Sequence, residues 1–140
     1  SRGDGAKLNG RRIRVSGRAS EVGALYATGI PFSSPSFDHM DGYLKTMHEL
    51  ATNSSGIRRM GAAALDLAYV AAGRMDAFWE MHLKPWDIAA GALLVREAGG
   101  MVSDFQGGEK FLETGHIVAC TPKLVKPTLK VISKHLGKVK

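Results

Sequence analysis

Apolar positions along this chain follow two spacings, one typical of β-strands and the other of α-helices. Short apolar runs bounded by glycine, proline or polar residues predict strands at 24–28, 57–60, 76–81, 101–104 and 116–120. Between them, apolar residues three and four positions apart predict helices at 37–52, 62–72, 86–98 and from 122 onward. Strands that alternate with helices of this length indicate a layered α/β fold, with helices packed on a mixed sheet.

Turn and cap residues mark the boundaries of these elements. Asn9-Gly10 is a strong hairpin signal, so a hairpin is expected within residues 7–20. Ser36 is a suitable N-cap for the first helix, and Gly73 is expected to end the second. Pro127 removes an N–H group inside the last helix, which is therefore expected to begin with an irregular turn or to be kinked there.

The composition suits one compact domain or half of a larger one. The chain has 140 residues, of which 44% are apolar. No apolar stretch is long enough to cross a bilayer and no signal peptide is recognisable, so no membrane association is expected. Cys120 is the single cysteine, which excludes an internal disulfide and favours a cytoplasmic location. Its position between Ala119 and Thr121 predicts a small buried side chain.

Positive charge exceeds negative charge, with 19 basic against 13 acidic residues and a formal charge of +6. Such an excess attracts phosphates, nucleic acids or acidic proteins without selecting among them. In the last predicted helix an apolar stripe runs beside a row of lysines at four-residue spacing, Lys126, Lys130, Lys134 and Lys138. This lysine row is either a solvated helix face or a contact for RNA or an acidic protein surface.

The segment 86–100 contains the most informative candidate residue, Asp87. Asp87 lies at the start of a predicted helix, where free N–H groups and the helix dipole hold its carboxylate and also attract anions. Three small residues, 89–91, follow in the next turn and let another group approach the backbone closely. A carboxylate beside an anion site suggests a cation and a phosphate in one pocket, although an ordinary helix cap is the commoner explanation.

Two further groups are expected to converge with Asp87. Glu80 ends a predicted strand, and Gly61-Ala62-Ala63 opens another helix after two arginines. In open α/β sheets, strand ends and the helix starts that follow them meet at one crevice. These groups would offer a cation ligand, a hydroxyl acceptor and backbone donors, which suits a phosphorylated polyol. From the residues alone, a solvated loop carboxylate at Glu80 and an ordinary turn at Gly61 remain the preferred explanation.

The remaining polar and aromatic residues receive structural interpretations. The five histidines lack the mutual spacing of a metal site and are expected to be solvated or to cap helices. Asp66 is interpreted as structural, and Trp79 and Trp86 as core or interface aromatics. Glu97 lies near a helix C-terminus, where the dipole disfavours it, so it needs a partner such as Arg96 or a neighbouring chain.

A set of short motifs spans nearly the whole chain in a fixed order. They are Gly5-Ala6-x-Leu8-Asn9-Gly10, Ala27-Thr28-Gly29-Ile30-Pro31-Phe32, Arg58-Arg59-Met60-Gly61, residues 63–73, Trp86-Asp87 and Arg96-Glu97-Ala98-Gly99-Gly100. With this order and spacing, the chain resembles the C-terminal half of the inositol monophosphatase family, most closely its bacterial extragenic-suppressor branch. The resemblance implies the C-terminal part of the layered αβαβα sugar-phosphatase fold.

The resemblance also implies an activity and roles for the candidate residues. The family hydrolyses phosphate monoesters such as inositol 1-phosphate with Mg²⁺ ions and an activated water, and lithium inhibits it. By resemblance, Asp87 binds metal and touches the substrate, Glu80 binds inositol hydroxyls, and Gly61, Ala62 and Ala63 form a substrate-binding loop. Oxygen ligands and water suit Mg²⁺, which can activate water and stabilise a leaving oxygen. Relatives usually carry Ser or Thr at Ala62, so a hydroxyl contact is lost there while a backbone contact would survive.

The family's other metal carboxylates belong to its N-terminal half, whose Asp-Pro-Ile/Leu-Asp-Gly-Thr motif does not occur in this chain. Residues 1–20 are therefore expected to be the end of the N-terminal sheet domain, and residues 21–140 the C-terminal α/β domain. No catalytic group is expected in this half, and one carboxylate cannot hold a pair of Mg²⁺ ions. The chain alone is expected to be inactive. Its expected partners are the missing half of the same protein and, by resemblance, a second copy in a homodimer.

The same bacterial branch is also linked to transcription antitermination through transcription factors and RNA polymerase. The resemblance therefore leaves a second hypothesis, an interaction module that binds transcription machinery or RNA through its basic surface. Charge reversal of the lysine row separates the two hypotheses. An enzyme would keep its activity, whereas an interaction module would lose its complex.

Overall fold

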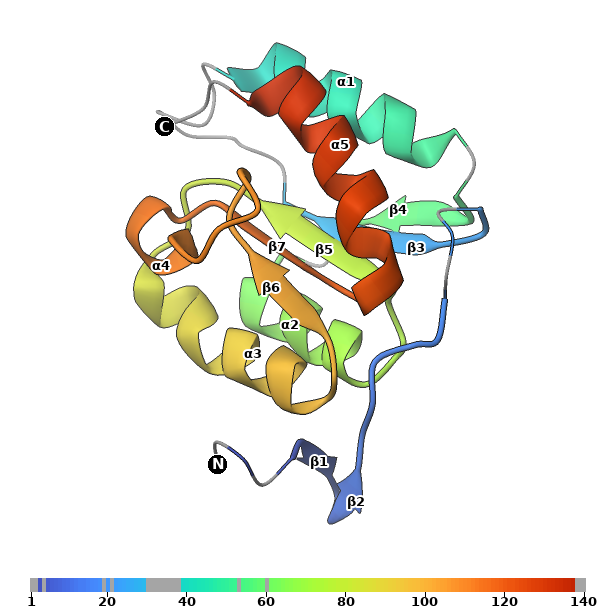
Figure 1. Ribbon diagram of the computed structural model, residues 1–140, viewed down its shortest axis with the longest axis vertical. Helices are drawn as coiled ribbons and strands as arrows, with labels where there is room; N and C mark the ends of the chain where they lie inside the picture. Colours follow the sequence, from blue (N-terminus) through green and yellow to red (C-terminus); the bar gives the residue numbers. More distant parts are fainter. Residues whose placement is uncertain are drawn as a thin grey trace.

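The computed structural model describes residues 3, 5–18, 20, 22–29, 39–52, 54–59 and 61–137. Five strands form one mixed sheet in the order β4-β3-β5-β7-β6 (Figure 1). They span Leu25–Thr28 (β3), Gly56–Arg58 (β4), Ala77–Glu80 (β5), Met101–Ser103 (β6) and Ile117–Cys120 (β7). β3 is parallel to both β4 and β5, whereas β7 is antiparallel to both β5 and β6. The strands β3, β4 and β5 therefore end at the same edge of the sheet.

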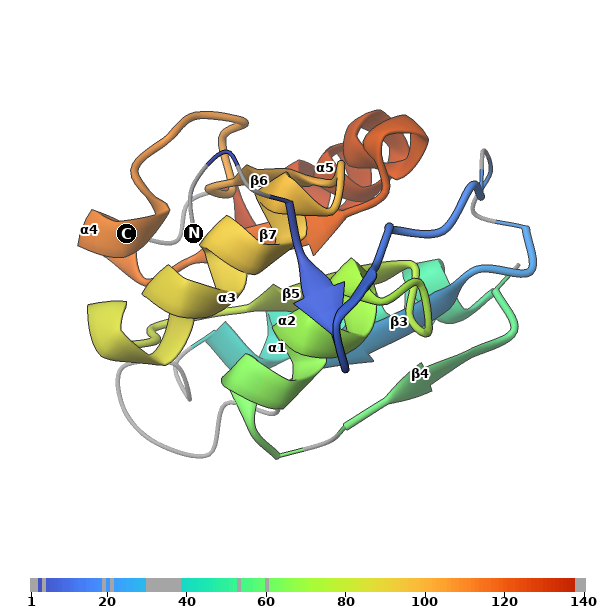
Figure 2. The same cartoon turned by 90° about the horizontal axis from the view of Figure 1, so that it is seen from below.

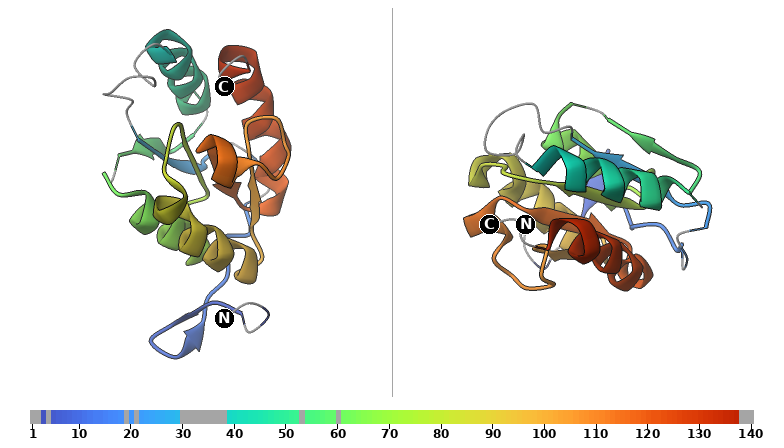
Figure 3. Two further views of the ribbon diagram at one scale, coloured as in Figure 1. Left: turned by 90° about the vertical axis from the view of Figure 1, so that its left-hand side faces the viewer. Right: turned by 90° about the horizontal axis from the view of Figure 1, so that it is seen from above.

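Helices cover both faces of this sheet (Figures 1 and 2). α2 (Ala63–Ala71) and α3 (Pro85–Glu97) cover one face, and α1 (Met40–Ala51) and α5 (Val125–Leu136) cover the other. The short helix α4 (Phe111–Thr114) precedes β7, and the 3-10 turn η2 (Pro122–Leu124) leads into α5. Two further views show the same layering (Figure 3). This arrangement confirms the predicted α/β class, with helices packed on a mixed sheet.

The central strands are apolar on both sides because both sides are covered. In β5, Phe78 belongs to the core beneath α2 and α3, whereas Ala77 and Trp79 belong to the core beneath α1 and α5. Neighbouring residues of a strand point to opposite faces, so one strand serves both cores. Cys120 is fully buried in the second core, and burial raises the pKa of its thiol to about 12. The prediction of a small buried side chain at Cys120 is confirmed.

Small residues let α2 and α3 pack closely. A Cβ atom built on Gly91 of α3 would come within 2.5 Å of Leu67 Cδ1 on α2. The close approach predicted for residues 89–91 is therefore made at Gly91 by the neighbouring helix α2. Trp86, by contrast, is 78% exposed and is not part of the core, whereas Trp79 is fully buried.

The predicted hairpin is formed by β1 (Lys7–Leu8) and β2 (Arg11–Arg12), which pair antiparallel. Its turn residues Asn9 and Gly10 have φ angles of 53° and 79°. Both lie in the left-handed region that a two-residue hairpin turn of this type requires, and Asn-Gly is the preferred pair there. The hairpin projects from the body of the molecule on the side of α2 and α3 (Figure 1).

The end of α3 holds the base of this hairpin. Gly5 N–H donates to Glu97 Oε1 (3.1 Å), and Val15 N–H donates to Ala98 O (3.0 Å). The partner of Glu97 is thus a backbone N–H group from the hairpin segment. Arg96, the partner suggested by the sequence, instead forms an ion pair with Glu109.

Several element boundaries differ from their predictions. α1 begins at Met40, and its predicted cap Ser36 lies outside the described residues, as does Lys138 of the lysine row. The irregular start predicted from Pro127 takes the form of the turn η2 before α5. Helix α4 is not among the helices that the sequence predicts. No helix in the described part of the chain is long and apolar enough to span a bilayer.

Candidate functional site

A cavity of about 470 Å³ lies where β3, β4 and β5 end and where α2 and α3 begin. Its lining includes all five candidate residues, Gly61, Ala62, Ala63, Glu80 and Asp87, together with Gly29, Arg59, Ala64, Leu83 and Trp86. The convergence expected from the topology therefore occurs, because parallel strands bring their ends and the following helix starts to one edge. Leu83, from the loop before α3, also lines the cavity, whereas its neighbours His82 and Lys84 do not.

Asp87 is fixed by the first turn of α3. Pro85 is the first helical residue, and Asp87 Oδ2 accepts a hydrogen bond from Lys84 N–H (3.0 Å). A carboxylate at the third helical position that accepts from the N-cap N–H in this way keeps a defined rotamer. Asp87 is only half-buried, so its carboxylate remains accessible from the cavity.

Glu80 is the last residue of β5, and its carboxylate lies against the backbone of Gly29 at the end of β3. A Cβ atom on Gly29 would come within 2.0 Å of Glu80 Oε1, so only glycine leaves room for this placement. Burial is the largest cause that raises the pKa of Glu80 to about 7; the charges of Asp66 and Asp87 contribute to this rise, and Arg59 opposes it. Glu80 is therefore a carboxyl group that titrates near neutral pH.

Asp66 is the buried carboxyl group behind this cavity. It lies in the first turn of α2 and is 1% exposed. Neither of its oxygens has a hydrogen-bond partner among the described residues. Desolvation raises the pKa of Asp66 to about 6. The sequence indicated only a structural role, because an acidic residue in the first turn of a helix is usually exposed and stabilises the helix dipole.

The start of α2 supplies backbone rather than side-chain groups. Gly61 has a φ of 84°, a left-handed conformation that glycine adopts without strain. The N-cap residue Ala62 makes no side-chain capping hydrogen bond. The first N–H groups of a helix have no intrahelical partner, so this end of α2 presents donors with a positive helix dipole behind them.

The chemistry of the lining suits a hard cation, although the described residues do not complete a metal site. Among the described residues, no group of three His, Cys, Asp or Glu side chains is placed to hold a metal ion. The Asp87 carboxylate, which lines the cavity, is an oxygen ligand of the kind that Mg²⁺ prefers. A cation bound to Asp87 would also offset the negative charge by which Asp87 raises the pKa of Glu80. Mg²⁺ therefore fits this donor set, provided that further ligands come from outside it.

Three histidines that are distant in sequence gather beside the loop that joins β5 to α3. The ring centroids of His39 and His82 are 6.1 Å apart, and those of His82 and His116 are 4.4 Å apart. The expectation that the histidines are solvated or cap helices is wrong for His116, which is 2% exposed. The apolar pattern predicts a strand over residues 116–120, and β7 begins one residue later, at Ile117. The ring of His116 packs against His82 in the loop between β5 and α3, a contact that the local pattern does not reveal.

Comparison with known proteins identifies a matching family and close relatives. The family model described as "Inositol monophosphatase family" matches residues 1–136. Nus factor SuhB from Pseudomonas aeruginosa is 61% identical over 136 residues, which cover 97% of this chain and 50% of that protein. Nus factor SuhB from Escherichia coli K12 is 51% identical over 129 residues, covering 92% of this chain and 48% of that protein.

Solved structures agree with this match. The extragenic suppressor protein SuhB from Bartonella henselae has a TM-score of 0.89 at 44% identity, covering 96% of this chain and 51% of that one. The inositol monophosphatase from Anabaena has a TM-score of 0.83 at 34% identity, covering 96% of this chain and 54% of that one. The chain therefore spans about half the length of the curated relatives that it matches.

Proposed function

The chain belongs to the inositol monophosphatase family, and we propose that it supplies one wall of a Mg²⁺-dependent site for phosphate monoester hydrolysis. The observation that carries this proposal is the convergence of Asp87, Glu80 and the start of α2 on one cavity at the ends of parallel strands. The substrate proposed for the site is a small phosphorylated polyol, with inositol 1-phosphate as the best candidate. A cytoplasmic location belongs to the same proposal.

Each lining group has a role that follows from its chemistry. Asp87 is the metal ligand from this chain and also contacts the substrate, since its capped rotamer points an accessible carboxylate into the cavity. Glu80 accepts hydrogen bonds from polyol hydroxyls, as its carboxylate is fixed against Gly29. Gly61, Ala62 and Ala63 offer backbone donors to the substrate, with no hydroxyl at Ala62. Bound Mg²⁺ would activate water and stabilise the leaving oxygen.

We further propose that the remaining metal ligands and the groups that position the attacking water come from a segment corresponding to the other half of the relatives. A protein that joins residues 1–140 to such a segment is called the complete protein below. Residues 1–20 would end its N-terminal sheet domain and residues 21–140 would form its C-terminal α/β domain. The hairpin beyond α3 is consistent with this division, because its strands pair only with each other among the described residues. A homodimer is the proposed assembly.

The experiment measures phosphate release from inositol 1-phosphate with and without Mg²⁺. The complete protein is expected to be active with Mg²⁺, and the 140-residue chain alone is expected to be inactive. Glu80→Gln in the complete protein is expected to raise KM more than it lowers kcat, because the amide weakens acceptance from polyol hydroxyls. Phosphate release by the chain alone, or an unchanged KM in the Glu80→Gln variant, would contradict the proposal.

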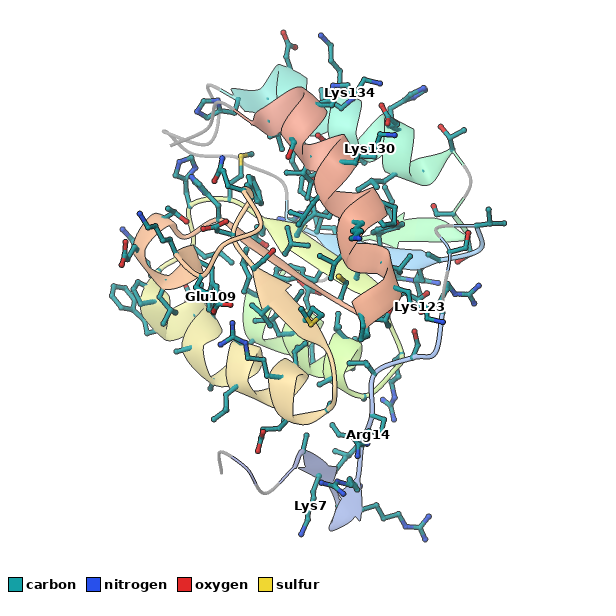
Figure 4. The ribbon with its side chains drawn as sticks, in the orientation of Figure 1. Lys7, Arg14, Glu109, Lys123, Lys130 and Lys134 are labelled. Carbon is teal, nitrogen blue, oxygen red and sulfur yellow. The ribbon has the colours of Figure 1, made fainter. Side chains whose placement is uncertain are left out.

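A second candidate function is an interaction module for transcription machinery or RNA. It is favoured by the name Nus factor carried by relatives from P. aeruginosa and E. coli, and by the exposed lysines of α5. Lys130 and Lys134 lie along the outer side of that helix, and Lys123 lies in the turn η2 that precedes it (Figure 4). Lys134 Nζ already pairs with Glu49 Oε1 at 3.0 Å, which leaves Lys126 and Lys130 as the better contacts for a partner.

Charge reversal at Lys126 and Lys130 separates the two functions. If the lysine row binds RNA, the double Glu variant loses RNA affinity and the salt dependence of binding falls. If the row is only a solvated face, the double variant binds RNA no more weakly than wild type. In the complete protein the phosphatase activity of the variant stays unchanged.

A further inference from the structure

The loop between Glu80 and Asp87 is short and carries a site residue at each end. Glu80 pairs with Ile117 in the β5–β7 register, so the loop leaves the sheet beside the start of β7. Asp87 is linked to the loop through its hydrogen bond from Lys84 N–H. A movement of this loop therefore changes the separation between the carboxylates of Glu80 and Asp87.

Two hydrogen bonds continue the attachment to β7 beyond the last residue of β5. His82 N–H donates to Nδ1 of His116 (3.2 Å), and Leu83 N–H donates to Gly115 O (3.0 Å). A Cβ atom on Gly115 would come within 2.3 Å of Leu83 O, so glycine is what allows the loop to approach. Of these two hydrogen bonds, the first uses the side chain of His116 and the second joins backbone groups.

His82 adopts a backbone conformation that the loop alone would not favour. Its φ is 55°, in the left-handed region where a non-glycine residue costs about 1 kcal/mol or more. Such a conformation persists only where the surroundings hold it. Here the rings of His82 and His116 meet nearly at right angles, with their centroids 4.4 Å apart, and the ring of Phe105 stacks on that of His116 at 5.2 Å.

The role of His116 in this contact fixes its tautomer. Nδ1 accepts the hydrogen bond from His82 N–H, so Nδ1 carries no proton and the ring proton lies on Nε2. The ring is 2% exposed, and its own backbone N–H donates to Thr114 Oγ1 (3.1 Å). His116 is thus held in place from several sides and offers a fixed acceptor to the loop.

We propose that His116 is a positioning residue of the site, whose Nδ1 holds the His82 amide and thereby sets the separation of Glu80 and Asp87. The effect of His116 on catalysis rests on the proposed function of the cavity. The hydrogen bond by which His116 attaches the loop does not depend on that function. His116 touches neither substrate nor metal in this account. It acts through the loop that joins β5 to α3.

A matched pair of substitutions isolates the acceptor. In His116→Asn, the amide oxygen takes the place of Nδ1 at the same number of bonds from Cβ, and the acceptor is kept. His116→Leu puts a methyl group there in a side chain of similar size. Both variants lose the ring contacts with His82 and Phe105, so any difference between them reports the hydrogen bond.

The first measurement is amide hydrogen exchange of His82 and Leu83 in this chain, followed by NMR. Removing the acceptor of this partly buried N–H group favours opening of the loop, so exchange of the His82 amide is expected to be at least about fivefold faster in His116→Leu than in His116→Asn. A nitrogen-15 spectrum of the wild-type ring is expected to show the Nε2–H tautomer. Equal exchange in the two variants, or a proton on Nδ1, would overturn the proposal.

The second measurement is made on the complete protein with Mg²⁺ and inositol 1-phosphate. His116→Leu is expected to raise KM and the Mg²⁺ concentration for half-maximal activity about tenfold, while His116→Asn stays within about twofold of wild type. A purely structural role would lower the melting temperature of both variants and leave these constants equal. That outcome would also overturn the proposal. If the wild-type complete protein is inactive, the proposed function fails, and the exchange experiment alone decides whether His116 holds the loop.

Discussion

Replacing Asp66 by asparagine is expected to change the pH dependence of folding. Asp66 is 1% exposed, and neither of its carboxylate oxygens has a hydrogen-bond partner among the described residues. Burial of this kind disfavours the charged form, and the pKa of Asp66 accordingly rises from 3.8 to about 6. The folded protein therefore holds the Asp66 proton more tightly than the unfolded chain does.

The sign and size of the effect follow from this shift. Below its usual pKa, Asp66 is neutral in both states and contributes no penalty. As the pH rises toward the folded value of about 6, the unfolded chain ionises first, and stability falls by at most about 3 kcal/mol. Asp66 also raises the pKa of Glu80, so its removal relieves part of that penalty in the same direction. Asparagine still carries an unpaired buried amide, but the cost of that group does not vary with pH.

Urea denaturation of the wild-type chain and the Asp66→Asn variant measures this difference. The free energy of unfolding of the variant relative to wild type is expected to increase by up to about 3 kcal/mol between about pH 4 and pH 7. Asp41→Asn is the matched control, because Asp41 lies in the first turn of α1 and is exposed to solvent. A difference between variant and wild type that stays constant over this range would refute the argument that Asp66 is buried without a partner.

Three further predictions concern glycines and the single thiol. Gly29→Ala is expected to raise the KM of the complete protein about tenfold, because the added Cβ displaces the Glu80 carboxylate. Gly17→Ala is the control, since no atom lies within 4 Å of its Cβ position. An unchanged KM in Gly29→Ala would contradict the placement of Glu80. Gly91→Ala is expected to destabilise the chain by about 1–3 kcal/mol in urea titrations, because its Cβ meets Leu67, and wild-type stability would refute this packing. Cys120 is expected to react with a thiol reagent only when the chain unfolds, because the side chain is buried and burial raises its pKa to about 12. Rapid labelling of the native chain would contradict this burial.

Local signals in the sequence predicted most of the helices and strands. The Asn9-Gly10 turn and the left-handed Gly73 are set by the conformations that these residues favour, so their positions could be read directly. Helix α4 could not be predicted, because a single helical turn leaves no periodic pattern and its end at Gly115 looks like any glycine turn. The start of the last helix was predicted better, because Pro127 lacks the N–H group that a regular helix from residue 122 would need at that position. In the structure α5 begins at Val125, and Pro127 lies in its first turn, where no intrahelical N–H bond is made.

The candidate site was predictable where it depends on topology. Parallel strands that alternate with helices bring Glu80, Asp87 and Gly61 to one edge, whatever the details of packing. Asp66 and His116 were not predictable as functional neighbours, because their burial arises from segments far away in the sequence. His116 contacts the loop after β5 only through the register of β5 with β7, which no local pattern encodes.

The central claim, that Asp87 is the metal ligand this chain contributes to a phosphatase site, is tested most directly by a Mg²⁺ titration of the complete protein. The rate of phosphate release from inositol 1-phosphate is followed for wild type, Asp87→Asn and the first-turn control Asp41→Asn. Asp87→Asn keeps a capping oxygen but loses the negative charge that binds the ion, so the account predicts a severe loss of Mg²⁺-supported rate in this variant alone. Near-normal rates and an unchanged Mg²⁺ dependence in Asp87→Asn would contradict it.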